Sequence, residues 1–365
     1  MKKKFFKTIL LTTMVISLVG CSSMSNSNIQ KAKFEKINAD LKVGMVTDSG
    51  SINDKSFNQG TWNGIKDTVN YSKYIKPTNS TTMDFLNSIT NLYDANYKFI
   101  VTPGYTFEGA IYEAQNKFKD ATFLLLDGIP TNNNGESNIS ENTLCISFAE
   151  HEAGFLAGLA SAVEIKEGQF GFIGGIEIPA VQKLNWGFQQ GVNYANENLG
   201  TNIEIKEEHV IYQGTFTDVA AGQQIASHYL DNGVDVIFVA AGLTGSGALN
   251  EIKSRAMNGE NVWAVGVDVD QYEEGIYQNG KSVILTSAMK HLDQAVYSTI
   301  KDFSEGKFEG GKINTFSIKN DGVGIPEINP NLSEKTLKEV DNVKGLIKTG
   351  IIEVKDNNCN NFLIK

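Results

Sequence analysis

Short apolar runs alternate with longer amphipathic stretches along most of this 365-residue chain. The runs are rich in β-branched and aromatic residues, as is typical of buried strands in a parallel sheet. The stretches between them have the length and polarity of helices, so the order predicts repeated βαβ units. The expected strands form two series, 42–46, 99–101, 123–126 and 144–148, then 169–173, 209–212, 234–240 and 262–267.

The two series predict two similar α/β lobes, because no segment of unusual composition separates them. A chain of this length buries enough apolar surface for two domains. Beyond the second series we expect a strand, a long helix, another strand and a final helix, over 282–288, 291–303, 315–318 and 333–349. The predicted fold class is therefore α/β, with parallel sheets in two Rossmann-like lobes.

The N-terminal segment has the pattern of a secretory signal peptide. Four lysines within residues 2–7 precede an apolar run, 9–19, that contains no acidic residue and is too short to span a bilayer comfortably. It ends in Leu18-Val19-Gly20-Cys21, which resembles the lipobox of bacterial lipoproteins, although a signal peptide could end this way by chance. We expect an anchor at the extracytoplasmic membrane face, with a signal peptide over 1–20, lipid on Cys21 and a flexible tether over 21–39.

Charge and side-chain usage argue against several classes of function. The net charge is −10 and no basic run lies outside the signal segment, which argues against nucleic acid as a partner. Arg255 is the only arginine, so a phosphate site would lack its usual guanidinium. Cys145 lies in an apolar run and Cys359 in a polar tail, which favours no thiol chemistry. His151-Glu152 begins like a zinc motif, but Phe155 stands where the second histidine belongs, so we expect no metal site.

Polar residues directly follow several of the expected strands, at the sheet edge where open α/β proteins bind ligands. Asp48 and Asn58 bracket a loop and helix start that also offers one aromatic side chain, Phe57. Asp127 and Asp268 stand at the ends of two further strands. Each aspartate could simply be a helix cap, but three of them at strand ends favour a binding site for a small polar ring system over a catalytic centre.

A glycine-rich segment, 242–247, follows the strand expected over 234–240. It is neither a dinucleotide fingerprint nor a Walker A loop, which would need a lysine after the last glycine. Its backbone N–H groups could approach a ribose hydroxyl or a carboxylate closely. A tight turn with a helix cap at Thr244 or Ser246 is an equally good interpretation.

Several segments together resemble the basic membrane protein family, bacterial lipoproteins that include purine nucleoside receptors of transport systems. The segments that carry the resemblance are Asp48–Gly50, Asp54–Asn58, Phe148, Glu152–Gly158, Gly171–Gly175, Trp186–Phe188, Gly266–Gln271 and Thr286–Lys290. The similarity covers about residues 40–350. It implies a type I periplasmic-binding-protein fold, in which two lobes joined by three crossovers enclose a ligand-binding cleft.

The resemblance also implies a nucleoside held in that cleft. Phe57 matches the aromatic residue of the first lobe that stacks on the base. Its partner from the second lobe would be Trp186 or Phe188, and the resemblance leaves both open. The polar positions that match are Asp48, Asn58 and Asp127 beside the base, and Gly242, Asp268 and Lys290 beside the ribose.

Lys290 has a second interpretation, because its ammonium could neutralise Asp268 without touching a ligand. The implied partners are a nucleoside such as adenosine, guanosine or inosine, the permease of an ABC-type importer, and a membrane reached through the lipid. No cofactor is implied. The expected lobes are 40–149 plus about 286–308, and 150–285 plus about 309–356, followed by a tail over 357–365.

Other classes of function remain open at this point. A nucleoside hydrolase on the same scaffold would use Asp268 and Asp270 as a metal or acid–base pair, but two aspartates so close in a loop need not converge on one point. A receptor for a free sugar would leave Phe57 with less to hold. A purely structural or adhesive surface protein would need no cleft chemistry.

Overall fold

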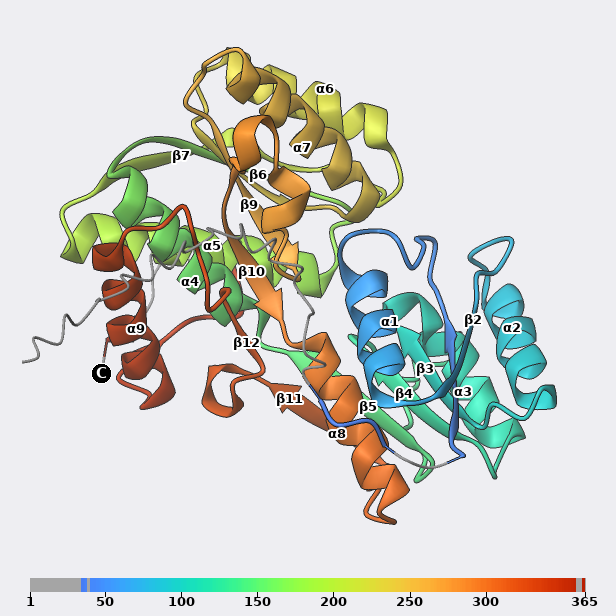
Figure 1. The fold of residues 1–365 in the computed structure, drawn as a ribbon. Coiled ribbons are helices and arrows are strands. Elements are labelled where there is room, and N and C mark those ends of the chain that lie inside the picture. Colours follow the sequence, from blue (N-terminus) through green and yellow to red (C-terminus); the bar gives the residue numbers. More distant parts are fainter. Residues whose placement is uncertain (1–33, 38–39, 359–362, 365) are drawn as a thin grey trace, which may run out of the picture. The chain divides into compact units, whose positions relative to one another are not determined.

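The computed structural model describes residues 34–37, 40–358 and 363–364. The expected signal peptide, Cys21, most of the expected tether and Cys359 lie outside these residues. Within the described part of the chain, two six-stranded sheets hold most of the strands (Figure 1). The strand order is β11-β5-β4-β3-β1-β2 in the first sheet and β12-β10-β9-β8-β6-β7 in the second. The predicted α/β class with parallel sheets is confirmed.

Every pairing in the first sheet is parallel. Its strands are β1 (Lys42–Val46), β2 (Tyr71–Ile75), β3 (Phe99–Pro103), β4 (Thr122–Leu126), β5 (Thr143–Phe148) and β11 (Lys312–Phe316). The second sheet is parallel except that β12 runs antiparallel to β10. Its strands are β6 (Glu167–Gly174), β7 (Asn202–Tyr212), β8 (Val236–Ala240), β9 (Trp263–Asp268), β10 (Ile284–Lys290) and β12 (Val323–Gly324).

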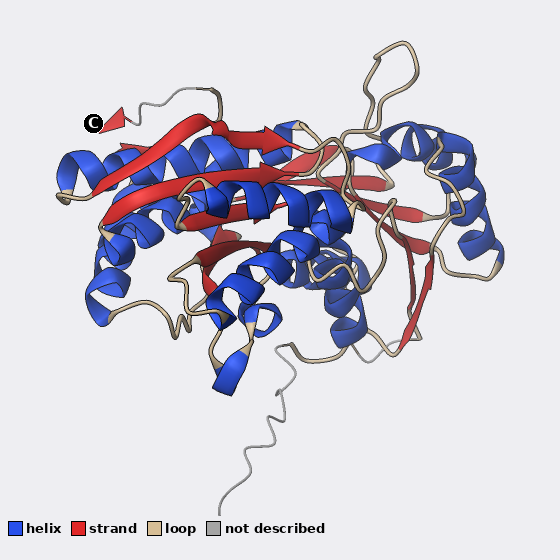
Figure 2. Ribbon diagram, turned by 90° about the horizontal axis from the view of Figure 1, so that it is seen from above, coloured by secondary structure: helices blue, strands red, loops and turns tan. Residues whose placement is uncertain are grey.

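Helices flank the strands of both sheets (Figure 2). The α-helices are α1 (Phe57–Thr68), α2 (Thr82–Asp94), α3 (Glu108–Lys117), α4 (Glu150–Ile165), α5 (Pro179–Asn198), α6 (Val219–Asp231), α7 (Gly242–Met257), α8 (Leu292–Ser304) and α9 (Glu334–Lys348). A small antiparallel pair, β13 (Ile352–Glu353) and β14 (Leu363–Ile364), follows α9. In the described residues no helix combines the length and the apolar character needed to span a bilayer.

The chain passes between the sheets three times, after β5, after β10 and after β11. The lobe boundaries expected near 286 and 309 differ from these positions. Strand β10 still belongs to the second sheet, and β11 belongs to the first. The pattern of a strand in the sequence does not indicate which of two similar sheets the strand joins, so it could not place β10 and β11.

Strand β2 is absent from the sequence prediction. Its sequence, Tyr-Ser-Lys-Tyr-Ile, has no apolar run because it lies at the edge of the sheet and three of its five side chains are exposed. The later elements are found close to their expected places. The helices expected over 291–303 and 333–349 are α8 and α9, whereas the strand expected over 315–318 begins three residues earlier.

Helix α4 joins the hydrophobic cores of the two sheets. Most of its residues are buried, and the largest hydrophobic cluster runs from β1 through this helix to β6 and β8. Glycines bring α4 very close to α5. A Cβ atom at Gly154 would lie 2.2 Å from the carbonyl oxygen of Leu184, and one at Gly191 would lie 2.1 Å from that of Phe155. The Ala-Gly-Phe-Leu-Ala-Gly segment of α4 is therefore built for helix packing.

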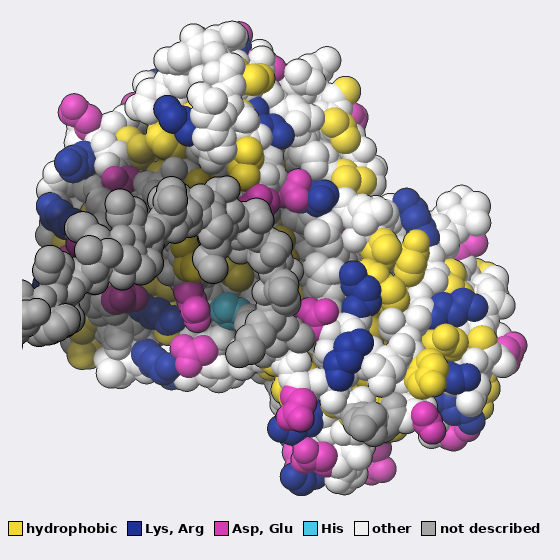
Figure 3. All heavy atoms as spheres, in the orientation of Figure 1, with side chains coloured by type: hydrophobic (Ala, Val, Ile, Leu, Met, Phe, Trp, Pro, Cys, Tyr) yellow, Lys and Arg dark blue, Asp and Glu magenta, His cyan; other side chains and the backbone are white. Residues whose placement is uncertain are grey.

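Acidic and basic side chains are interspersed on the molecular face seen in Figure 3. Many charged side chains of the described residues form exposed ion pairs, such as Lys98 with Asp120 and Lys348 with Asp321. Surface pairs of this kind contribute little to stability. Arg255 is held by Asp231 and Glu251 around α7, so the single guanidinium of the chain does not line the pocket described below.

Candidate ligand-binding site

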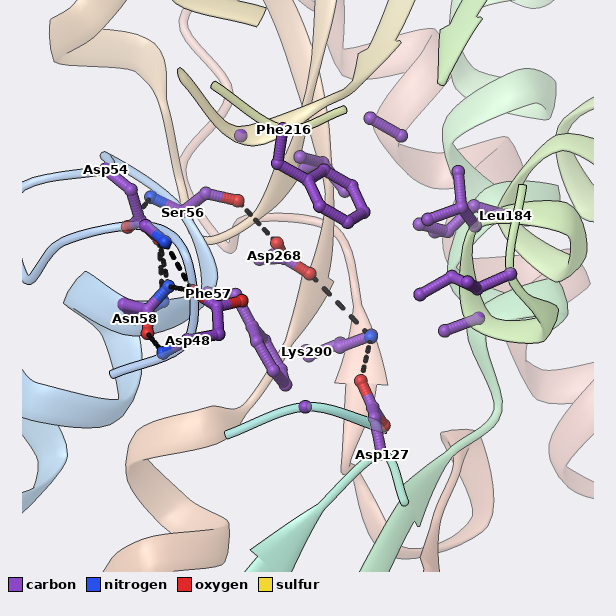
Figure 4. Close-up of a pocket in the computed structure, with 18 of the residues that line it drawn as sticks. Asp48, Asp54, Ser56, Phe57, Asn58, Asp127, Leu184, Phe216, Asp268 and Lys290 are labelled. Carbon is purple, nitrogen blue, oxygen red and sulfur yellow. Dashed lines mark hydrogen bonds and ion pairs between the residues drawn. The ribbon is translucent and has the colours of Figure 1, made fainter. Parts of the chain in front are cut away.

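A pocket lies where strand ends of both sheets meet, and Figure 4 shows its polar core. It holds about 720 Å³ of empty space, its open mouth included, which is in the range of small-molecule sites. Its walls come from the ends of β1, β3, β4, β8, β9 and β10 and from the first turns of α1, α5 and α7. Seven of the nine expected ligand-binding residues line it, namely Asp48, Phe57, Asn58, Asp127, Gly242, Asp268 and Lys290.

Asp54 organises the start of α1. Its carboxylate accepts the backbone N–H groups of Ser56, Asn58 and Gln59 at 2.9–3.0 Å. This buried carboxylate satisfies N–H groups that the helix leaves unpaired, so it caps α1, which begins at Phe57. The helix start is thereby fixed at the wall of the pocket.

The side-chain amide of Asn58 forms hydrogen bonds with neighbouring protein groups. Its Nδ2 donates to Oδ1 of Asp48 and Oδ2 of Asp54, both at 2.8 Å, and its Oδ1 accepts the N–H of Asp48 at 3.4 Å. Oδ1 of Asp48 also accepts the N–H of Gly50 at 2.7 Å. Among the described residues, the hydrogen bonds to the Asp48 carboxylate therefore use Oδ1 alone. Oδ2 stays available to a ligand, and burial raises the pKa of Asp48 to about 6 despite these bonds.

Lys290 is the buried cation of the pocket. Its Nζ lies 2.6 Å from Oδ2 of Asp127, 3.3 Å from Oε1 of Glu150 and 3.8 Å from Oδ1 of Asp268. Burial lowers the pKa of Lys290, but the three carboxylates outweigh that effect and raise it above its usual value. Burial raises the pKa of both Glu150 and Asp268, against the opposing attraction of Lys290. The structural role suggested for Lys290 is thus present, with Asp127 as its nearest partner.

Two of these carboxylates sit on unusual backbone. Asp127 has φ 52° and Asp268 has φ 64°, in the left-handed region that costs most side chains energy and that aspartate tolerates better than other non-glycine residues. Both residues directly follow strands, β4 and β9. Oδ1 of Asp127 is buried and has no hydrogen-bond partner among the described residues. An unsatisfied buried acceptor beside an open pocket is a natural contact for a ligand donor.

Three further bonds join the loop before α1 to the segment after β9. Ser56 Oγ donates to Oδ2 of Asp268 at 2.5 Å. Gln271 Nε2 donates to the carbonyl oxygen of Lys55 at 2.7 Å, and the Lys55 ammonium lies 3.0 Å from Glu274. These contacts hold groups from the two sheets together around the pocket, and no pattern in the sequence indicates them.

Neither of the two residues expected as the second stacking aromatic, Trp186 and Phe188, lines the pocket. Phe188 has no exposed surface and packs against Phe170 and Phe238 in the core. Trp186 is partly exposed on another face of α5, and it does not line the pocket. The aromatic that does line it from the second lobe is Phe216, in the loop between β7 and α6. In Figure 4 its ring and that of Phe57 both border the cavity.

The glycines of segment 242–247 have two different roles, one in lining the pocket and one in helix packing. Gly242 lines the pocket with φ 54° at the start of α7. A Cβ atom at Gly247 would lie 1.9 Å from the carbonyl oxygen of Val219, so this glycine lets α7 pack closely on α6. Thr244 does not cap the helix. Its hydroxyl accepts the N–H of Asp218 and donates to the carbonyl of Thr215, which fixes the loop that carries Phe216.

The carboxylates suggested for a hydrolase do not converge. Asp268 lines the pocket, whereas Asp270 lies outside its lining and accepts the N–H of Tyr272 at 3.0 Å. Across the described residues, no group of three or more His, Cys, Asp and Glu side chains could hold a metal ion. Cys145 is fully buried, as expected for a core residue, and burial raises the pKa of its thiol to about 12.

Comparison with known proteins decides the family. The family described as "ABC transporter substrate-binding protein PnrA-like" matches residues 41–358. The chain belongs to this Bmp family. Basic membrane protein D of Borreliella burgdorferi is 32% identical, with 92% of each chain covered. "ABC transporter nucleoside-binding protein BmpA" of Lactococcus lactis is 29% identical, over 93% of this chain and 94% of that protein.

Solved structures agree with the fold of a Bmp protein. An ABC transporter solute-binding protein from Aeropyrum pernix has a TM-score of 0.73 at 23% identity and covers 87% of this chain and 94% of that chain. An arabinose-binding protein from Geobacillus stearothermophilus has a TM-score of 0.55 at 15% identity and covers 83% and 99%. At these identities the likeness establishes the fold alone. The expected fold of ABC solute-binding proteins is therefore confirmed.

Proposed function

We propose that this Bmp protein is a lipid-anchored receptor that binds purine nucleosides and delivers them to an ABC-type importer. The observation that carries the proposal is the pairing of two aromatic side chains, Phe57 and Phe216, with buried carboxylates in one pocket. A planar base fits between aromatic faces, where stacking contributes roughly 1–3 kcal/mol per ring. The name of the Lactococcus lactis relative supports a nucleoside as the ligand.

The polar groups divide into a base side and a ribose side. On the base side Oδ2 of Asp48 accepts an N–H of the purine, while Asn58 holds the Asp48 carboxylate in place. The unsatisfied Oδ1 of Asp127 accepts a further donor on this side, whereas on the ribose side the carboxylate of Asp268 accepts hydroxyls. Lys290 keeps these carboxylates together, and its Nζ also lies over the Phe57 ring, 5.0 Å from the ring centre.

The same electrostatics disfavour phosphorylated ligands. Asp48, Asp54, Asp127 and Asp268 line the pocket, and Lys290, the one cation among the described residues that line it, is already bound to carboxylates. A nucleoside monophosphate would bring negative charge toward these groups without a free partner for it. A neutral nucleoside should therefore bind and its phosphate should not.

The anchor and the importer belong to the same proposal. The lipobox-like Leu18-Val19-Gly20-Cys21 supports lipid attachment at Cys21 after removal of residues 1–20. A tether would then keep the receptor on the extracytoplasmic face of the cell membrane, close to its permease. Labelled fatty acid supplied to the expressing cells should enter the chain, and Cys21→Ala should abolish the labelling.

Isothermal titration tests the ligand. The soluble form, residues 22–365, is unfolded and refolded to remove any ligand it carries. It is then titrated with adenosine, guanosine, inosine, cytidine, uridine and ribose, with AMP as the charged control. We expect micromolar or tighter binding of a purine nucleoside and no heat from AMP.

Variants separate the pocket from the rest of the surface. Phe57→Ala should abolish the heat, whereas Tyr71→Ala, which removes a half-exposed aromatic from the edge strand β2, should leave it unchanged. Absence of heat from every nucleoside would refute the proposal. Heat from ribose alone would instead support the sugar receptor, and release of free base during the titration would support a hydrolase.

A further inference from the structure

The hydroxyl of Ser56 is committed to Asp268. Ser56 Oγ donates to Oδ2 of Asp268 at 2.5 Å, and both residues are buried, with 2% and 8% of their surfaces exposed. Ser56 directly precedes α1, but its side chain makes no capping bond to the helix. Asp54 already performs that task. The Ser56 hydroxyl therefore acts as a donor aimed at a carboxylate in the wall of the pocket (Figure 4).

The two oxygens of Asp268 are consequently unequal. Oδ2 holds a hydrogen bond from the protein before any ligand arrives. Oδ1 lies 3.8 Å from Nζ of Lys290, which is too long for a direct hydrogen bond. The Lys290 ammonium is held closer to Asp127 and Glu150. Among the described residues Oδ1 has no hydrogen-bond donor, so of the two oxygens it is the one that depends on a ligand.

A polar site rejects an analogue that lacks a hydroxyl because one of its own buried groups is then left unpaired. That penalty is absent at an oxygen that the protein itself supplies with a donor. We infer that Asp268 demands one hydroxyl of the ribose and tolerates the loss of the other, so that the site accepts deoxynucleosides as well as ribonucleosides. This inference rests on the proposed nucleoside function and specifies its substrate class.

Binding of sugar-modified ligands to the full chain, kept in solution with a mild detergent and stripped of ligand, tests the inference. Two series are titrated, built on adenosine and on inosine, each with its 2′-deoxy, 3′-deoxy and 2′,3′-dideoxy analogues. In the series whose parent binds, at least one singly deoxy analogue should bind within about tenfold of the parent. The dideoxy analogue should be weaker than the parent by more than about tenfold, because Oδ1 then loses its donor.

Ser56→Ala tests the cause directly. Without its hydroxyl, Oδ2 must take its donor from the ligand, so the tolerated deoxy analogue should become weaker than the parent by more than about tenfold. Ser56→Thr keeps a hydroxyl and should restore the wild-type ratio. The matched control is Ser51→Ala in the same loop, because among the described residues that hydroxyl accepts the N–H of Asn53 alone and makes no bond to Asp268.

The outcomes distinguish the two levels of the argument. If neither parent nucleoside binds, the proposed function fails and this inference fails with it. If a parent binds but both singly deoxy analogues are more than about tenfold weaker, the inference alone is overturned. It is also overturned if the dideoxy analogue binds within that margin, or if Ser56→Ala leaves the ratio of affinities unchanged.

Discussion

Nζ of Lys290 lies 2.6 Å from Oδ2 of Asp127, so a single buried ion pair joins the end of β10 in the second sheet to the end of β4 in the first. Glu150, at the start of α4, completes the cluster at 3.3 Å from the same ammonium. The Lys290 ammonium therefore links both sheets to α4, the helix that joins their cores. The same cluster borders the pocket, so the stability of the fold and the shape of the site share these residues.

Lys290→Met should destabilise the protein strongly. The substitution leaves the carboxylates of Asp127, Glu150 and Asp268 buried without their cation, and breaking a buried pair in this way costs about 3–5 kcal/mol. Urea unfolding at neutral pH measures the loss. At lower pH the loss should shrink, because burial raises the pKa of Glu150 and Asp268 and protonation removes their charge.

The control for that experiment is Lys98→Met. Lys98 pairs with Asp120 on the surface, where both side chains are well exposed, so its loss should destabilise the protein far less than the loss of Lys290. Equal losses in the two variants would show that the Lys290 cluster contributes no more than a surface pair.

Phe216→Ala should weaken nucleoside binding, and Trp186→Ala should not. Phe216 lines the pocket opposite the first lobe, whereas Trp186 lies outside its lining. Loss of one stacked ring costs roughly 1–3 kcal/mol, which corresponds to about a five- to 150-fold loss of affinity. Titration of the preferred nucleoside into both variants measures this. A larger loss of affinity in Trp186→Ala than in Phe216→Ala would favour Trp186 as the second stacking aromatic, as the family resemblance suggested.

The contrast between these two aromatics shows what the sequence could reveal. Strand ends are local features, so Asp48, Asp127 and Asp268 could be found from apolar runs that stop at an aspartate. Phe216 gives no such signal. It follows a strand of mixed polarity, in a loop that Thr244 fixes through contacts between residues 26 and 29 positions apart. Only the folded chain brings that loop to the pocket.

The same reasoning explains the errors in the fold. Strand β2 was missed because an exposed edge strand has no apolar run. The lobe boundaries differ because the residues of a single strand do not determine which other strands it pairs with. The role of Ser56 has no signal in the sequence, because only the folded chain brings its hydroxyl to Asp268, 212 positions away, while Asp54 caps α1.

Binding of nucleosides that offer an N–H to Asp48 should depend on pH. Burial raises the pKa of Asp48 to about 6, so the carboxylate is an acceptor above that pH and is protonated below it. Affinity for inosine or guanosine should therefore be constant above pH 7 and fall by up to about tenfold per pH unit below 6. The charges of Asp54 and Lys76 also act on Asp48, and Asp48 in turn acts on Tyr105.

The matched variant for the pH experiment is Asp48→Asn. An amide at this position keeps the shape of the side chain and cannot titrate, so the fall in affinity below pH 6 should disappear. A profile that remains unchanged in Asp48→Asn would assign the pH dependence to another group, such as Glu150 beside Lys290.

Gly154→Ala should destabilise the protein and also disturb the pocket. The added Cβ would lie 2.2 Å from the carbonyl oxygen of Leu184 and 3.0 Å from the backbone nitrogen of Phe188. Both atoms belong to the backbone of α5, so no side-chain rotation can relieve the clash and the two helices must separate. Overpacking of this kind typically costs about 1–3 kcal/mol. Leu184 lines the pocket, so the displaced helix should weaken ligand binding as well.

Gly345→Ala provides the comparison. Gly345 lies within α9, and no atom stands within 4 Å of the position its Cβ would take. Replacing a helical glycine with alanine at such a site should raise stability by about 0.5–1 kcal/mol, because alanine loses less backbone entropy on folding. Urea unfolding measures the free energy of unfolding of both variants, which we expect to fall in Gly154→Ala and to rise in Gly345→Ala. Equal stability of Gly154→Ala and the wild type would mean that α4 and α5 can move apart freely, and the close packing of these helices would then not be what fixes Leu184 at the pocket.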